Sequence, residues 1–293
     1  MSNILALNHR RTAQDHAALL PPLLAEARHL AASVVMGAHG RRQVGTGEEF
    51  WQYRPAQTGD NWRAVDWRRS GRSDAHFIRQ MEWQAAQSVM FWIDGAKSMQ
   101  FSGEKSRATK AARASVLGLA TAILLTRAGE RVGLVDDNEP PKTGEAQIDR
   151  LTTKLAARDT QQDYGFPATN IAPKGSRVVF LSDFLGDLAV LRAAVGRAAD
   201  RGVKGAIVQI LDPVEESFPF DGRTSFESIA GTLRFETLRA RGLKAGYLAK
   251  LAERKAALQE MAIRVGWQYD CHHTSQPAQP VLMWLYAALE KVR

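Results

Sequence analysis

The sequence predicts an α/β fold with three layers, in which helices cover both faces of a mostly parallel sheet of the Rossmann type. From residue 88 onward, short apolar runs alternate with longer helical segments, which is the pattern of βαβ units. Three of the apolar runs end in an aspartate, namely Asp94, Asp183 and Asp212. The chain is 45% hydrophobic and 24% charged, which is typical of folded globular proteins and excludes a disordered or collagen-like chain.

The main domain is expected to cover residues 86–293. Its expected strands lie at 88–93, 131–135, 177–181, 204–211 and 265–271. Its expected helices lie at 105–127, 146–157, 185–200, 243–265 and 281–292. Between the fourth strand and the fourth helix the alternation pauses at about 213–238, where Pro219, Gly222 and Gly231 predict a hairpin insertion.

Residues 1–85 are expected to form a helical and loop-rich extension that packs on the main domain. Leucines at helical spacing predict a helix pair over 13–38, and Pro21-Pro22 marks the start of its second helix. The following segment, 39–86, carries eight arginines before residue 80 and several glycines. Five of the seven tryptophans lie between positions 51 and 92, so we expect a compact loop-and-strand element rather than a flexible linker.

Several classes of protein are excluded by simple counts. The single cysteine, Cys271, excludes an internal disulfide and a cysteine-based zinc site and favours a reducing compartment. The longest uncharged helical stretch, 114–126, is too short to cross a bilayer, which takes roughly 20 residues. At the N-terminus the basic residues follow a short apolar run, the reverse of a secretory signal. We therefore expect a soluble cytoplasmic protein.

Two of the strand-end aspartates suggest a cation site. Asp94 and Asp183 follow the first and third strands, and Ser98 and Ser182 bring hydroxyls to the same loops. Ligands of open α/β sheets bind beyond the carboxyl ends of the strands, and hard oxygen ligands suit Mg²⁺ or Mn²⁺. The alternative is that these aspartates only cap the helices that follow them.

A resemblance covers roughly residues 10–290. Its pieces are Gly45-Thr46-Gly47-Glu48-Glu49-Phe50, Arg54, Gly59-Asp60, Trp62-Arg63, Asp66-Trp67-Arg68, Ser70, Arg72, Glu82, Asp94, Ser98-Met99, Gly129–Leu134, Ser182-Asp183-Phe184, Asp212-Pro213 and Glu216. In this order they resemble the bacterial domain of unknown function 58 family, whose members carry a von Willebrand factor A-type domain.

The resemblance implies a metal-ion-dependent adhesion site of the Asp-x-Ser-x-Ser type. It maps onto Asp94, Ser98 and Asp183, with Thr143 as the best match for the later threonine, since Thr169 lies too near the third strand. Ala96 stands where the middle serine is expected and offers no hydroxyl. The implied site is therefore degenerate and would bind Mg²⁺ or Mn²⁺ weakly.

Lys97 adds a cation to the same loop and has two interpretations. Turned inward, its ammonium would partly neutralise Asp94 and Asp183; turned outward, it would lie in solvent. In both cases we expect Lys97, Asp94 and Ser98 to belong to a partner-binding surface.

The sequence contains no recognisable catalytic constellation, so we expect a non-enzymatic adaptor. The resemblance implies that it works with a MoxR-class AAA-type ATPase in protein assembly or activation. One alternative is a metal-dependent hydrolase that uses Asp94 and Asp183. Another is nucleic-acid binding through the arginine-rich segment 41–79, which is disfavoured because acidic residues alternate with the arginines and predict internal ion pairs. The segment Asp270-Cys271-His272-His273 is expected to be structural, because the chain has no further cysteine.

Overall fold

The computed structural model describes residues 22–34, 41–45, 49–57, 60–71, 76–158, 162–168, 172–227 and 234–291. The chain divides into two compact units, residues 38–87 on the one hand and residues 1–37 with 88–293 on the other. The division after residue 87 lies close to the expected boundary at residue 85, whereas the helix over 22–32 belongs to the larger unit and not to the smaller one. Ala27 and Ala31 of this helix are fully buried in the same core cluster as residues of the main sheet.

The larger unit is built on a five-stranded parallel sheet, which confirms the predicted fold class. Its strand order is β10 (Gln268–His273), β7 (Lys204–Leu211), β6 (Arg177–Ser182), β4 (Ser88–Ile93) and β5 (Arg131–Leu134). All four neighbouring pairs are parallel; β6 is the middle strand and β4 lies beside it. Their residues are almost all buried, as expected for strands that are covered on both faces.

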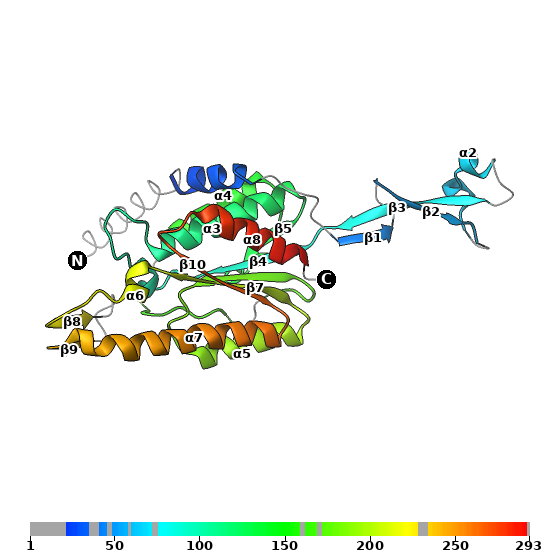
Figure 1. Cartoon of the computed structure of the whole chain (residues 1–293). Helices are drawn as coiled ribbons and strands as arrows, with labels where there is room; N and C mark the ends of the chain where they lie inside the picture. Colours follow the sequence, from blue (N-terminus) through cyan, green and yellow to red (C-terminus); the bar gives the residue numbers. More distant parts are fainter. Residues whose placement is uncertain are drawn as a thin grey trace. The chain divides into compact units, whose positions relative to one another are not determined.

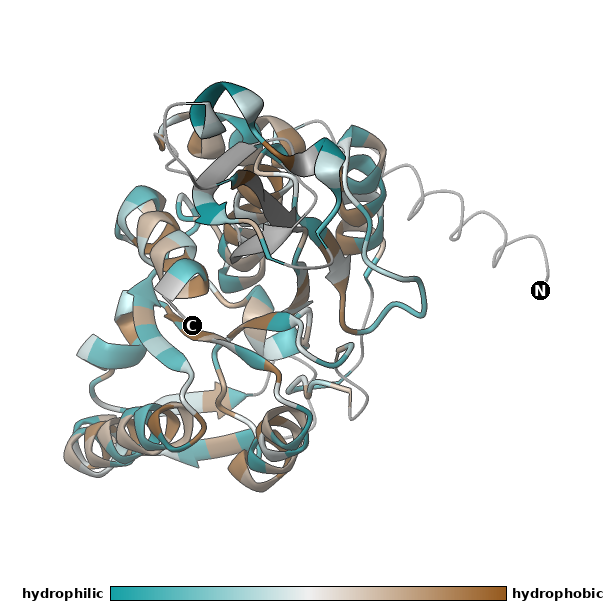
Figure 2. Ribbon diagram, turned by 90° about the vertical axis from the view of Figure 1, so that its right-hand side faces the viewer, coloured by the Kyte–Doolittle hydropathy of each residue, from teal (hydrophilic) through white to brown (hydrophobic). Residues whose placement is uncertain are grey.

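Helices cover both faces of this sheet (Figure 1). One face carries α3 (Lys110–Arg127), α4 (Glu145–Ala156), α8 (Ala278–Lys291) and the helix over 22–32, and the other carries α5 (Leu188–Asp200) and α7 (Lys244–Arg264). The flanking helices contain both hydrophilic and hydrophobic residues along their length, as amphipathic helices do (Figure 2). Of the helices in the described ranges, none combines the length and apolarity needed to span a membrane.

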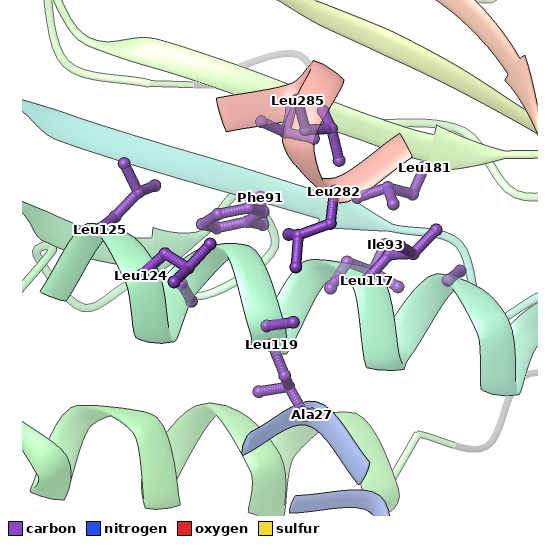
Figure 3. Close-up of a cluster of buried hydrophobic side chains, with 14 of the residues drawn as sticks. Ala27, Phe91, Ile93, Leu117, Leu119, Leu124, Leu125, Leu181, Leu282 and Leu285 are labelled. Carbon is purple, nitrogen blue, oxygen red and sulfur yellow. The ribbon is translucent and has the colours of Figure 1, made fainter. Parts of the chain in front are cut away.

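Side chains of the central strands alternate between two hydrophobic cores. Phe91 of β4 packs in the core under α3 and α8, whereas its neighbour Trp92 packs in the core on the α5 and α7 side. Helix α3 is buried on more than one side, which explains why its middle carries no charge. Leu117 and Leu124 pack with the sheet, and Leu119 points to Ala27 on the other side of α3 (Figure 3).

Several elements begin later than the sequence predicts, among them α3, α5 and β10. Helix α3 starts at Lys110 rather than residue 105, because the Thr109 side chain accepts a hydrogen bond from the Ala112 N–H and caps the helix there. Strand β10 starts at Gln268 rather than residue 265. The preceding helix α7 runs to Arg264, and Gly266, with a positive φ of 70°, closes its C-terminus before the strand can start.

The structure has the predicted insertion between β7 and α7. It contains α6 (Pro213–Ser217) and a hairpin of β8 (Thr224–Glu227) and β9 (Arg234–Thr237), followed by a 3-10 turn, η3 (Ala240–Leu243). The insertion therefore lies directly after the carboxyl end of β7.

The smaller unit is a three-stranded antiparallel sheet of order β1 (Arg41–Gly45), β3 (Phe77–Ala85) and β2 (Glu49–Pro55). Arg54 and Asp60 form a two-pronged ion pair with N···O distances of 2.6 and 2.7 Å. Hydrogen bonds from Arg54 and from the Gln57 N–H lower the pKa of Asp60 to about 2. At this position the arginine forms the internal ion pair that the charge alternation predicts.

Some sequence-based expectations lie outside the described residues. They concern the first helix of the pair predicted over 13–38, residues 46–48, Gly59 and Arg72 of the resemblance, and the alternative threonine, Thr169.

Candidate functional site

The direction in which successive strands are added to the sheet reverses between β4 and β6. From β4 the chain continues to β5 on one side, and from β6 it continues to β7 on the other. Asp94 follows β4 and Asp183 follows β6, so both aspartates lie at the point where open α/β sheets bind ligands. The Asp94 N–H donates to the Leu181 carbonyl at 2.9 Å, and the Ser182 hydroxyl donates to Asp94 Oδ2 at 2.7 Å. The structure thus brings the two predicted aspartate loops together.

The Asp94 carboxylate is enclosed by the protein. It is 4% exposed, and its Oδ1 accepts a hydrogen bond of 2.8 Å from the Ala96 N–H while Oδ2 accepts from Ser182. Gly165 covers it so closely that a Cβ at this position would overlap Oδ1. Burial raises the pKa of Asp94, although the hydrogen bonds from Ser182 and Ala96 oppose the shift. Both oxygens are therefore held by bonds within the chain.

Asp183 is paired with a buried lysine. The Lys110 ammonium, from the first turn of α3, lies 2.9 Å from Asp183 Oδ2 and 2.6 Å from Glu215 Oε1, and the lysine is 1% exposed. Burial alone would lower the pKa of Lys110, but the carboxylates of Asp183 and Glu215 outweigh it and raise that pKa. The lysine therefore stays charged and pairs with both carboxylates. Asp183 Oδ1 accepts from the Leu185 N–H at 3.0 Å.

Glu215 connects this cluster to the end of β7. Its Oε2 accepts a 2.8 Å hydrogen bond from the Asp212 N–H, and the Asp212 side chain caps α6 in return. Asp212 also accepts from Thr274 Oγ1 at 3.0 Å and lies 3.1 Å from an Arg107 nitrogen. Burial would raise the pKa of Asp212, but these hydrogen bonds lower it. The third strand-end aspartate is thus a structural cap.

Of the remaining predicted site residues, Ser98 and Lys97 lie in the loop after β4, whereas Thr143 lies elsewhere. Ser98 Oγ is buried and has no hydrogen-bond partner among the described residues, and Lys97 is half-buried. Thr143 is exposed and not at the site. Its neighbour Lys142 forms an isolated β-bridge with Val132. Val132 of β5 is paired with Val89 of β4, which lies five residues before Asp94. Five residues of strand span about 17 Å, so Thr143 lies toward the opposite end of the sheet.

A divalent cation does not fit this arrangement. The predicted ligand Asp183 faces the Lys110 ammonium, Asp94 is enclosed, Ala96 has no hydroxyl and Thr143 lies elsewhere. A metal ion at Asp183 would lie beside a buried positive charge, and like charges repel strongly where water is excluded. The positive charge that a metal would bring is supplied by Lys110.

The sequence reasoning missed both Lys110 and Glu215. One signal for Lys110 was available, because a cation in the first turn of a helix is unfavourable to the helix dipole and calls for an anionic partner nearby. For Glu215 the signal was its spacing three residues after Asp212, as in a capping box. Neither pattern reveals that the two side chains meet, because they are 105 residues apart.

A second group of candidate ligands lies beside β10. Glu216, Cys271 and His273 offer atoms within 4.8 Å of one another. However, the Lys255 ammonium contacts Glu216, and His273 Nε2 lies 2.6 Å from Glu216 Oε2. The Glu216 carboxylate is thus already paired with two basic side chains of this chain. These contacts favour the structural role expected for the segment 270–273 over metal binding.

A family model described as "Protein of unknown function DUF58" matches residues 52–257, well over half of the chain. The chain belongs to the DUF58 family. The DUF58 match runs from β2 into α7 and includes Asp94, Lys110, Asp183 and Glu215. Comparisons with curated proteins and with solved structures found no match.

Proposed function

We propose that the chain is a non-enzymatic protein-interaction module that works with a MoxR-class AAA-type ATPase in the assembly or activation of other proteins. The ATPase partnership is supported by the resemblance of the chain to its family. We place this role in the cytoplasm, where a chain with one cysteine needs no oxidising compartment.

The observation that carries the proposal is the pairing of Lys110 with Asp183 at the centre of the sheet. A general base or a metal ligand needs a carboxylate that can accept a proton or an ion from a substrate. Here Asp183 is neutralised by Lys110, and Asp94 is enclosed with both oxygens bonded. The pairing supports a rigid scaffold that presents loops rather than a reactive centre.

Within this proposal, the loop after β4 contacts the partner. Lys97 is half-buried at the start of a 3-10 turn, η2 (Lys97–Gln100), and its backbone is fixed by a 2.9 Å hydrogen bond from its N–H to the Gln162 carbonyl. A lysine held at the carboxyl edge of the sheet can pair with an acidic side chain of the ATPase.

The test is retention of a purified MoxR-class ATPase on the immobilised chain. We expect the wild type to retain the ATPase and Lys97→Glu to retain at least fivefold less. Lys154→Glu, the same charge reversal at an exposed position of α4, serves as the matched control and should bind as the wild type does. No retention by the wild type would overturn the partnership, and equal retention by Lys97→Glu would remove this loop from the interface.

A second candidate, nucleic-acid binding, is favoured by one observation. Trp62 and Trp67 are 66% and 56% exposed, and their rings are parallel with centroids 6.0 Å apart. Arg63 and Arg68 are exposed in the same segment. Aromatic rings beside arginines can stack on bases and contact phosphates. A mobility shift of single-stranded RNA that weakens steeply with salt and is lost in Trp62→Ala/Trp67→Ala would support this candidate.

The hydrolase alternative has a direct test too. Turnover of a generic phosphoester such as p-nitrophenyl phosphate, lost in Asp94→Asn but retained in Lys154→Glu, would contradict the non-enzymatic proposal.

A further inference from the structure

An aromatic hollow of about 650 Å³ lies beside the buried cluster, at the same carboxyl edge of the sheet. It is formed by α6, the β8–β9 hairpin and the first turns of α7, which lie together in Figure 1. Glu215, whose carboxylate faces Lys110, is part of its wall, as is Phe101 from the loop after β4. A hollow of this size is in the range of ligand-binding cavities.

The wall of the hollow is a packed set of aromatic rings. Phe218 lies with its ring centroid 5.0 Å from that of Tyr247, 5.2 Å from Phe220 and 5.8 Å from Phe226. Phe218 has a left-handed backbone (φ 42°) at the C-terminus of α6, which costs a non-glycine residue on the order of 1 kcal/mol. The contacts of its ring hold it there. The hollow is therefore preformed and does not depend on a ligand to form.

Large apolar side chains continue from the hollow onto the open surface. Phe235 and Leu243, both in its wall, are 56% and 38% exposed, and nearby Leu238 is 72% exposed. Exposed apolar side chains clustered beside a hollow are typical of interaction sites, whereas scattered ones are not.

The rim of the hollow is positively charged. Lys250 is part of the wall, and Arg241 and Lys244 are next in sequence to the wall residues Gly242 and Leu243. All three are exposed and form no ion pair with the residues that the structure describes. Three of the acidic side chains in this part of the chain are paired, since Glu215 faces Lys110, Glu216 contacts Lys255 and Glu236 lies 2.7 Å from Arg223. Residues 213–255 carry eight Lys and Arg against six Asp and Glu. The net charge of the rim thus favours a ligand with acidic groups.

The spread of these cations indicates a polypeptide rather than a small carboxylate. Lys244 and Lys250 are six residues apart on α7, which is about 9 Å along the helix axis. One carboxyl group cannot reach both, whereas acidic side chains spaced along a peptide can. The exposed apolar surface beyond the hollow likewise needs a ligand that extends over it.

From these contacts we infer that the hollow between α6, the β8–β9 hairpin and α7 binds a segment of a partner protein in which an aromatic or leucine side chain is flanked by Asp and Glu. The apolar side chain enters the aromatic hollow, and the flanking carboxylates pair with Lys244 and Lys250. This inference rests on the proposed interaction role but does not require the partner to be the ATPase.

The probes are three fluorescent 12-residue peptide pools with a fixed central Phe-Leu pair and randomised flanks. One pool draws its flanks from Asp, Glu, Ser and Gly, the second from Lys, Arg, Ser and Gly, and the third is the acidic pool with Ala-Ala at its centre. Fluorescence polarisation against the full chain should show the acidic Phe-Leu pool binding at least tenfold more tightly than the other two.

Two exposed variants locate the binding on the chain. Phe235→Ser should weaken the acidic Phe-Leu pool at least fivefold, and Lys244→Glu/Lys250→Glu should weaken it and remove its preference for acidic flanks. Ile263→Ser on α7 is 67% exposed and away from the hollow, so it serves as the apolar control, and Lys154→Glu serves as the charge control.

The inference is overturned if the three pools bind alike, if no pool binds, or if Phe235→Ser changes nothing. It is also overturned if decanoate competes with the acidic pool at equal concentration, because the hollow is then a site for small carboxylates. If no peptide pool binds but the chain still retains the ATPase, this inference fails and the proposed function is unaffected. If the acidic Phe-Leu pool binds but the chain does not retain the ATPase, this inference holds and the partnership with the ATPase is overturned.

Discussion

The Lys110 ammonium lies 2.9 Å from Asp183 Oδ2, and both side chains are about 1% exposed. This pair crosses from the first turn of α3 to the end of β6 and joins the two loops that define the centre of the sheet edge. Glu215 adds a second carboxylate at 2.6 Å, so one buried cation holds together segments from three parts of the chain. The site is consequently an internal ion cluster.

Removal of the lysine should destabilise the fold strongly. Lys110→Ala leaves Asp183 and Glu215 buried without a cation, which costs about 3–5 kcal/mol in the free energy of unfolding. Urea unfolding followed by circular dichroism measures this. The control is Lys142→Ala, whose partner Glu139 and own side chain are both at least half exposed, and it should cost less than about 1 kcal/mol. A similar loss in both variants would show that the Lys110 pair contributes little.

The sequence predicted the layers of the fold but not this cluster, and the difference has a physical cause. The strands 88–93 and 204–211 are recognisable because they are buried on both faces and read as continuous apolar runs. The meeting of Lys110 with Asp183 and Glu215 depends on tertiary packing, which no local pattern contains. For the same reason Thr143, placed only by its distance along the chain, proved to lie at the wrong end of the sheet.

Divalent cations should bind to a lysine-free variant but not to the wild type. Titration of the wild type with MnCl₂ in a calorimeter should give only heats of dilution, because the Lys110 ammonium already lies against both the Asp183 and the Glu215 carboxylates. In Lys110→Ala, whose Asp183 and Glu215 oxygens face one space, millimolar Mn²⁺ should raise the melting temperature, and Lys110→Ala/Asp183→Asn should lose that effect. Saturable heat with the wild type would show that Lys110 does not keep Mn²⁺ from these carboxylates.

Gly165 should not tolerate a methyl group. An added Cβ would overlap Asp94 Oδ1, so Gly165→Ala must displace the 162–168 loop or the carboxylate, at about 1–3 kcal/mol of unfolding free energy. Gly196 in α5 is the matched control, since no atom lies within 4 Å of its added Cβ. There the same change should stabilise the helix by about 0.5–1 kcal/mol. If both substitutions change the free energy of unfolding in the same direction, Gly165 does not enclose Asp94.

The stability of the protein should fall as the pH is lowered below about 6.5, because of His272. Burial, with help from the positive charges of Arg113 and His273, lowers the pKa of His272 to about 4, from 6.5 for the ordinary group. Above pH 6.5 the residue is neutral in both states and has no effect, whereas below it the unfolded chain takes up the proton first. Between pH 7 and pH 5 this difference removes about 2 kcal/mol of unfolding free energy.

Urea unfolding at pH 7 and pH 5 on the wild type and on His272→Gln measures that contribution. The variant should start less stable, because the buried ring is lost, but its stability should fall by about 2 kcal/mol less between the two pH values. Ile263→Ser, a change at an exposed residue without an ionisable group, should leave the wild-type pH dependence unaltered. If the pH dependence of His272→Gln equals that of the wild type, the buried ring takes up its proton as readily in the folded protein as in the unfolded chain.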